Sequence, residues 1–335
     1  MNVKKIGLTA LAGSLVAMSA YAGELSISGN ADISYSEYTG NENRNVAGVR
    51  NTQTLRDADS NWGVTQGMTA SGSGELDNGW VVSISHALTS TGDASSTSTL
   101  SLDFGDGGVL SYADNSISGG LHSLDDITPT AWEEATDGVN GERQAGMADG
   151  AGFSYTNTFA GATVSVQYSD NFGGAANVDE GGVSTTGTDD GVSNSIGVTY
   201  PVGDSGFTIY GGIGTEGQAD GNDIDHDTIG FKFAMGPLTF GAQRNTEDDS
   251  AAASPLDLET NIIGVSYLVN ENLSISYGRH ETTADGATDQ EIDSIQAAYS
   301  MGGITVAAQN SQADNVANTE GATSEKTEIR VSFAF

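Results

Sequence analysis

Apolar and polar residues alternate along most of the chain after residue 24. In the segment 25–35, Leu25, Ile27 and Ile33 alternate with serine, asparagine and aspartate. Successive side chains of a β-strand point to opposite faces, so this period of two predicts strands with one apolar and one polar face. The alternation recurs in the segments 153–159, 164–168, 196–200, 229–233, 273–277 and 329–335. We therefore expect an all-β protein.

Two kinds of connection separate the predicted strands. Short ones, rich in Gly, Asn and Asp that accept a positive φ, lie at 77–79, 105–107, 160–161, 203–205, 235–237, 270–272 and 301–303. Long polar ones lie at roughly 37–60, 89–96, 114–150, 170–192, 214–225, 246–257, 282–289 and 313–323. Seven short and eight long connections in strict alternation join sixteen strands. This pattern predicts a transmembrane antiparallel up-and-down β-barrel.

Proline and arginine positions fit a closed barrel. All four prolines fall in predicted turns or loops, where no ladder hydrogen bond is lost. A sheet in lipid must pair both of its edges, so closure is required. Arg244 and Arg279 share the apolar parity of their strands near the strand ends. We expect these two side chains at the membrane rim.

The first 22 residues have the pattern of an export signal. Lys4 and Lys5 precede an uncharged apolar stretch, and Ala20-Tyr21-Ala22 offers the small residues that a signal peptidase reads. The alternative, a membrane anchor, is disfavoured because the stretch is shorter than the ~20 residues of a spanning helix. We expect a cleaved signal peptide, 1–22, and a barrel domain, 23–335.

Composition and charge narrow the class further. The chain has 46 glycines and no cysteine. Its hydrophobic fraction of 37% is low for a soluble protein of this size but suits a barrel with a polar interior. The formal net charge is −34. Removing the signal leaves nine basic residues against 45 acidic ones. This balance excludes nucleic acid as a partner and favours cations.

Two segments carry a resemblance to a known family. The chain ends Arg330-Val331-Ser332-Phe333-Ala334-Phe335, an alternating strand that closes on an aromatic residue. The stretch 71–80, SGSGELDNGW, resembles the second hairpin of the general diffusion porins. With the strand number and the long third loop, the chain resembles the acidic alphaproteobacterial porins over its whole mature length. The resemblance implies a homotrimer in the outer membrane, in contact with lipid and lipopolysaccharide. It also implies that the barrel-assembly machinery recognises Phe333 and Phe335.

In the family that the chain resembles, the third long loop folds into the pore and constricts it. Here the connection 114–150 is the longest of the eight. Its candidate constriction residues are Asp125, Asp126, Glu133, Glu134, Asp137, Glu142 and Arg143. The alternative is that these charges are solvated on an extracellular loop, since every long loop is acidic.

Family members also place basic side chains on the wall opposite this loop. The candidates are Arg56, in the first long connection, and Lys232, Lys326 and Arg330, which have inward parity on their strands. Lys326 and Arg330 flank Glu328 on one strand, so a local ion ladder is an alternative for them. The scarcity of arginine puts the strength of a transverse field in doubt.

Other chemistry finds little support. Asp223, Asp225 and Asp227 are spaced as at the start of an EF-hand, but Thr228 stands where that loop needs glycine. The four histidines show no metal spacing and no nucleophile elbow is present, so we expect neither a cofactor nor an enzyme. Adventitious Ca²⁺ on the acidic loops remains open.

The expected function is an outer-membrane porin that lets small hydrophilic solutes and ions diffuse passively, with a preference for cations. Three alternatives stay open: a substrate-specific porin with a ligand site in the lumen, an adhesin or structural barrel with a plugged pore, and a soluble calcium-bound β-protein.

Overall fold

The structure is a computed structural model of the chain. It describes residues 25–40, 59–89, 98–114, 117–125, 127–139, 151–172, 189–217, 223–249 and 257–334. The predicted signal peptide, 1–22, lies outside the described residues. Five candidate site residues do so as well: Arg56, Asp126, Glu142, Arg143 and Phe335.

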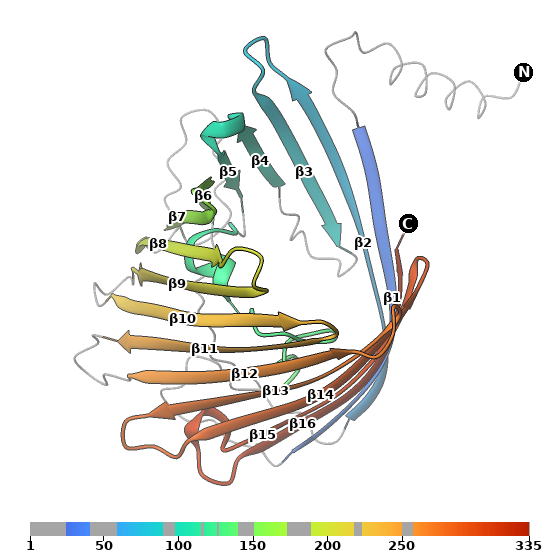
Figure 1. Ribbon diagram of the computed structural model, residues 1–335. Helices are drawn as coiled ribbons and strands as arrows, with labels where there is room; N and C mark the ends of the chain where they lie inside the picture. Colours follow the sequence, from blue (N-terminus) through green and yellow to red (C-terminus); the bar gives the residue numbers. More distant parts are fainter. Residues whose placement is uncertain are drawn as a thin grey trace, which may run out of the picture.

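Sixteen strands close into one antiparallel barrel, in which each strand pairs with its neighbours in the chain and β1 pairs with β16 (Figure 1). The first eight are β1 Leu25–Gly40, β2 Asp59–Glu75, β3 Val81–Thr89, β4 Ser98–Asp103, β5 Val109–Ala113, β6 Gly152–Phe159, β7 Ala162–Phe172 and β8 Asp189–Pro201. The others are β9 Phe207–Glu216, β10 Ile224–Met235, β11 Leu238–Asp249, β12 Leu258–Leu268, β13 Leu273–Ala284, β14 Gln290–Met301, β15 Ile304–Asp314 and β16 Thr323–Ala334. Three short helical turns lie between strands: η1 Gly105–Gly107, η2 Gly120–Leu124 and η3 Val316–Asn318.

The predicted architecture is confirmed in strand number, order and connection type. Each predicted short connection falls between two consecutive strands, as where β6 ends at Phe159 and β7 begins at Ala162. The predicted bounds of the long connections are less accurate. The connection expected at 170–192 is shorter, because β7 continues to Phe172 and β8 begins at Asp189. Backbone pairing continues past the last apolar side chain, since the ladder hydrogen bonds do not depend on side-chain polarity.

The two faces of the sheet have opposite polarity. Ile229 and Ile295 point outward and are 67% and 66% exposed. The inward side chains are polar and buried, among them Ser165, Ser195 and Gln243. A soluble protein would place these residues the other way round, so the barrel is built for an apolar surrounding. No helix among the described residues is long and apolar enough to cross a membrane.

Two outward arginines lie in the middle of their strands, β11 and β13. Arg279 on β13 forms ion pairs with Glu291 (2.8 Å) and Asp293 (3.3 Å) of β14. Arg244 on β11 pairs with Glu259 of β12. Both arginines therefore share the outward parity of the apolar residues and are neutralised by carboxylates on the neighbouring strand.

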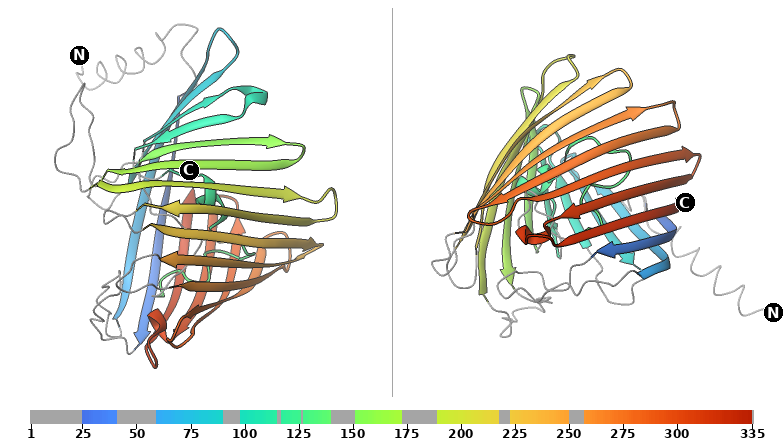
Figure 2. Two further views of the ribbon diagram at one scale, coloured as in Figure 1. Left: turned by 90° about the vertical axis from the view of Figure 1, so that its left-hand side faces the viewer. Right: turned by 90° about the horizontal axis from the view of Figure 1, so that it is seen from below.

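One segment of the chain leaves the barrel wall and lies inside it. Residues 117–125 and 127–139, called the inner segment below, follow β5 and pack on the concave side of the sheet (Figures 1 and 2). Its apolar residues Ile117, Leu121 and Leu124 are almost fully buried there. The inner segment belongs to the predicted third long connection and carries the candidate site.

Candidate functional site

Inward hydroxyl groups bind the backbone of the inner segment. The amide of Gly120 donates to Ser165 Oγ of β7, and the amide of Leu121 donates to Ser195 Oγ of β8, each at 3.0 Å. Further along, the amide of Ala131 donates to Ser276 Oγ of β13 at 2.8 Å. The polar inner face thus supplies the partners that the backbone of a buried loop needs.

Three inward glutamines anchor the segment more strongly. Gln243 Nε2 donates to the carbonyl oxygen of Leu124 at 2.8 Å and also to that of Asp125. Gln296 Nε2 donates to the carbonyl oxygens of Glu133 (2.6 Å) and Glu134 (3.3 Å).

The third glutamine, Gln309, donates through Nε2 to the carbonyl oxygen of Asp137 at 2.9 Å. The carboxamide oxygen of Gln296 also accepts from the amide of Trp132 at 3.1 Å. A carboxamide both donates and accepts, so it pairs with a peptide as another peptide would.

Inward glycines leave room for this close approach. A Cβ on Gly197 of β8 would lie 2.4 Å from the carbonyl oxygen of Gly120. A Cβ on Gly278 of β13 would lie 2.9 Å from the Cβ of Ala135. The inner segment therefore packs directly on the wall, which a side chain at either position would prevent.

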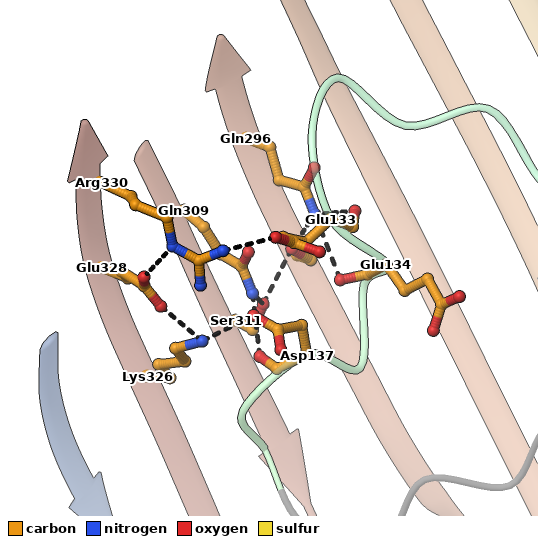
Figure 3. A network of polar contacts seen from close by, with 10 residues as sticks. Glu133, Glu134, Asp137, Gln296, Gln309, Ser311, Lys326, Glu328 and Arg330 are labelled. Atoms are coloured by element: carbon orange, nitrogen blue, oxygen red, sulfur yellow. Dashed lines mark hydrogen bonds and ion pairs between the residues drawn. The ribbon is translucent and has the colours of Figure 1, made fainter. Parts of the chain in front are cut away.

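A charged network joins the end of the inner segment to β16 (Figure 3). Lys326 Nζ lies 2.6 Å from Asp137 Oδ2 and 2.6 Å from Glu328 Oε2. Arg330 binds Glu328 through Nε and Glu133 through Nη1, each at 2.8 Å. Glu328 is buried between the two cations, so its charge is compensated on both sides. Glu133, Asp137, Lys326, Glu328 and Arg330 are called the charged network below.

The cations of the charged network are more covered than its loop carboxylates. The Lys326 side chain is 4% exposed, whereas those of Glu133 and Asp137 are each 35% exposed. Gly138 lies against the lysine stem, with its Cβ position 2.1 Å from Lys326 Cδ. The ring of Trp132 covers Arg330 at 4.6 Å. Three carboxylates face two cations, and the two loop carboxylates are the most exposed members of the network, at 35% against 26% for Arg330.

The remaining candidate residues lie apart from the charged network. Asp125 and Glu134 are partly buried in the inner segment and bind the wall through their carbonyl oxygens. Lys232 points inward from β10 with an exposed side chain, beside the β11 residue Gly241. Phe333 points outward near the end of β16, on the parity of the exposed Ile329. Among the candidates that the structure describes, it therefore brings together Glu133, Asp137, Lys326 and Arg330.

The anchoring glutamines were not predicted from the sequence. Gln243, Gln296 and Gln309 share the inward parity of their strands, which is the signal that could have marked them. Inward parity alone does not tell whether a glutamine binds the inner segment or is solvated in the lumen. For Lys326 and Arg330, the local ladder through Glu328 exists together with their contacts to the inner segment.

Acidic groups also meet at the ends of the long connections. The carboxylate of Asp248 raises the pKa of Asp257 above its usual range, and burial together with Asp285 and Asp249 adds to the effect. Like charges this close disfavour the ionised form. Within the described ranges, no group of three or more His, Asp or Glu side chains is arranged to hold a metal ion.

Comparison with models of protein families assigns the chain to a family. Residues 7–318 match the family model described as Gram-negative porin. This chain belongs to the Gram-negative porin family. It is accordingly a non-enzymatic channel of the outer membrane through which solutes diffuse passively, in a family that typically forms trimers.

Solved structures agree with the porin fold. A refined porin structure matches with a TM-score of 0.66 at 15% identity, covering 93% of this chain and 100% of that one. An anion-selective porin from Comamonas acidovorans matches with a TM-score of 0.62 at 14% identity, over 93% and 100% of the two chains. OmpF of Salmonella typhi, in complex with daunomycin, gives 0.62 at 10% identity, over 93% and 98%. A search of curated proteins finds no match. At these identities the likeness concerns the fold alone.

Proposed function

We propose that this porin is a cation-preferring general diffusion channel in which the inner segment narrows the pore. The observation that carries the proposal is the charged network. Lys326 is covered by Gly138 and Arg330 is partly covered by Trp132, while the carboxylates of Glu133 and Asp137 are the most exposed groups of the network.

Charge at a narrow point controls which ions enter. Carboxylates lining a water-filled passage attract cations and repel anions, and the low dielectric of the surrounding protein strengthens both effects. The network holds three carboxylates and two cations, so its net charge is negative. Since the basic residues lie against the inner segment, their charge is neutralised locally. A strong transverse field from Lys326 and Arg330 is therefore no part of this mechanism.

The packing of the inner segment supports its role as the constriction. It occupies part of the lumen and is held by hydrogen bonds from strands between β7 and β15. A segment fixed at so many points keeps a constant shape, as a size filter requires. The free passage runs along its water-facing side.

Other features complete the proposal. Residues 1–22 are a cleaved export signal, the mature barrel is a homotrimer of the acidic alphaproteobacterial kind, and Phe333 with Phe335 forms the assembly signal. The net charge of −34 supports the acidic type. The exposed apolar outer face supplies the surface that lipid and partner subunits cover.

Planar-bilayer recording of the purified porin tests the ion preference. In a KCl gradient at low salt, the reversal potential should have the sign of a K⁺-permeable channel. A potential of zero or of the opposite sign would overturn the preference. In liposome swelling, uncharged sugars should enter at rates set by their size and without saturation. Saturable entry of one sugar would instead support a substrate-specific porin.

A further inference from the structure

An apolar cluster lies where β14, β15 and the β15–β16 connection meet the inner segment. Its members Val139, Ile292, Ala313 and Val316 are all buried. They come from four elements. Val139 belongs to the inner segment, Ile292 and Ala313 are paired inward residues of β14 and β15, and Val316 lies in the connection from β15 to β16.

The β15–β16 connection is folded back over the barrel wall. Asn318 Nδ2 donates to the carbonyl oxygens of Thr282 at 2.9 Å and Thr288 at 3.0 Å. The amide of Ala317 donates to Gln290 Oε1 at 2.7 Å. The connection therefore crosses β14 and reaches β13, instead of extending outward from its own two strands.

The backbone of this connection is strained. Asn315, Ala317 and Asn318 have φ values of 54°, 52° and 56°, in the left-handed region that non-glycine residues rarely adopt. Such strain persists only where surrounding contacts determine the conformation. Here those contacts are the hydrogen bonds to β13 and β14 and the burial of Val316. The strained shape holds Val316 in the buried cluster that contains Val139.

The packing of Val139 in this cluster has a direct consequence for the charged network. Val139 stands two residues after Asp137, with only Gly138 between them. Gly138 has a φ of 75° and lies on the Lys326 stem. Fixing Val139 therefore fixes the carboxylate of Asp137 relative to Lys326 Nζ.

We propose that the β15–β16 connection clamps the end of the inner segment, and that Val316 is the positioning residue through which it maintains ion selectivity. The proposal rests on the proposed function in one respect, namely that the inner segment sets that selectivity. The apolar packing complements the ion pairs because salt screens the partly exposed carboxylates of Glu133 and Asp137, with a Debye length of about 3 Å at 1 M, but does not weaken apolar burial.

The variant Val316→Ser tests the clamp by replacing an apolar side chain with a smaller polar one. We expect several-fold more low-frequency noise in the open-channel current, growing with salt from 0.1 to 1 M, and a K⁺/Cl⁻ permeability ratio closer to one. Val202→Ser, at an exposed position in the β8–β9 connection, is the matched control and should record as wild type. Wild-type noise and selectivity in Val316→Ser would overturn the proposal.

A cysteine pair provides a test that does not depend on the folding of the serine variant. The chain has no cysteine, so V139C/V316C introduces the only two thiols. Oxidation of the assembled barrel should link them within one chain and leave the channel as quiet as wild type. Absence of the crosslink in folded barrels would refute the contact. If the wild type shows no cation preference, the proposed function fails, while the noise and crosslinking results still decide whether the clamp exists.

Discussion

Neutralising Asp137 is the sharpest single perturbation of the proposed constriction. Asp137→Asn keeps the size of the side chain and leaves the backbone carbonyl that accepts from Gln309. It removes one of the three carboxylates of the charged network, so that two carboxylates balance the two cations. Selectivity should fall because the net charge of the network becomes zero.

The size of the effect follows from the charge and the salt. An ion that passes about 8 Å from one unit charge in water gains or loses about 0.5 kcal/mol. Screening leaves about 0.4 kcal/mol at 0.01 M salt, where the Debye length is about 30 Å, and about 0.2 kcal/mol at 0.15 M. Since the charge acts on both ions with opposite sign, Asp137→Asn should lower the K⁺/Cl⁻ permeability ratio about fourfold at 0.01 M and about twofold at 0.15 M.

Reversal potentials in KCl gradients at the two salt concentrations measure this ratio. Asp204→Asn carries the same substitution in the β8–β9 connection, away from the inner segment, and should change the ratio less. The reasoning is refuted if Asp137→Asn keeps the wild-type ratio at 0.01 M, or if both variants change it equally.

Three further predictions concern the wall and the mouth. Lys326→Met removes the cation that Asp137 and Glu328 share, so the free energy of unfolding should fall by about 3 kcal/mol. An unchanged midpoint in a denaturant titration would contradict the stabilising role of these ion pairs. Gln296→Leu removes the donor to the carbonyl oxygens of Glu133 and Glu134, which should lower the free energy of unfolding by about 1–3 kcal/mol. Single-channel recordings of this variant should show a broader distribution of conductance than those of the wild type. Cation preference should fall as pH is lowered because carboxylates lose their charge, and Asp257 should protonate before an isolated aspartate since Asp248 raises its pKa. A reversal-potential titration of wild type against Asp257→Asn checks this order, which is contradicted if the two curves coincide.

Strand number and strand order could be predicted from the sequence because they depend on local patterns. Alternation marks each strand, and glycine or asparagine marks each short turn, as at Asn78-Gly79 and Gly302-Gly303. The strand ends were less predictable. Asp225 and Asp248 were assigned to long connections but belong to strands, since pairing of the backbone carries the sheet beyond its apolar band.

The candidate site was only partly predictable. Charge and position in the third long connection marked Glu133 and Asp137, and parity marked Lys326 and Arg330. That these four residues meet depends on the path of the inner segment, which is set by contacts more than 100 residues apart in the chain, such as Gln243 with Leu124. Val316 carried no sequence signal, because an isolated valine in a polar loop does not reveal its partner.

The K⁺/Cl⁻ permeability ratio of the wild-type porin, measured from 0.01 to 1 M KCl, tests the cation-selective constriction most directly. The exposed carboxylates of Glu133 and Asp137 predict a ratio above one at 0.01 M that approaches the ratio of bulk mobilities at 1 M, where the Debye length is about 3 Å. A ratio at or below one at 0.01 M, or a ratio that does not change with salt, would contradict it.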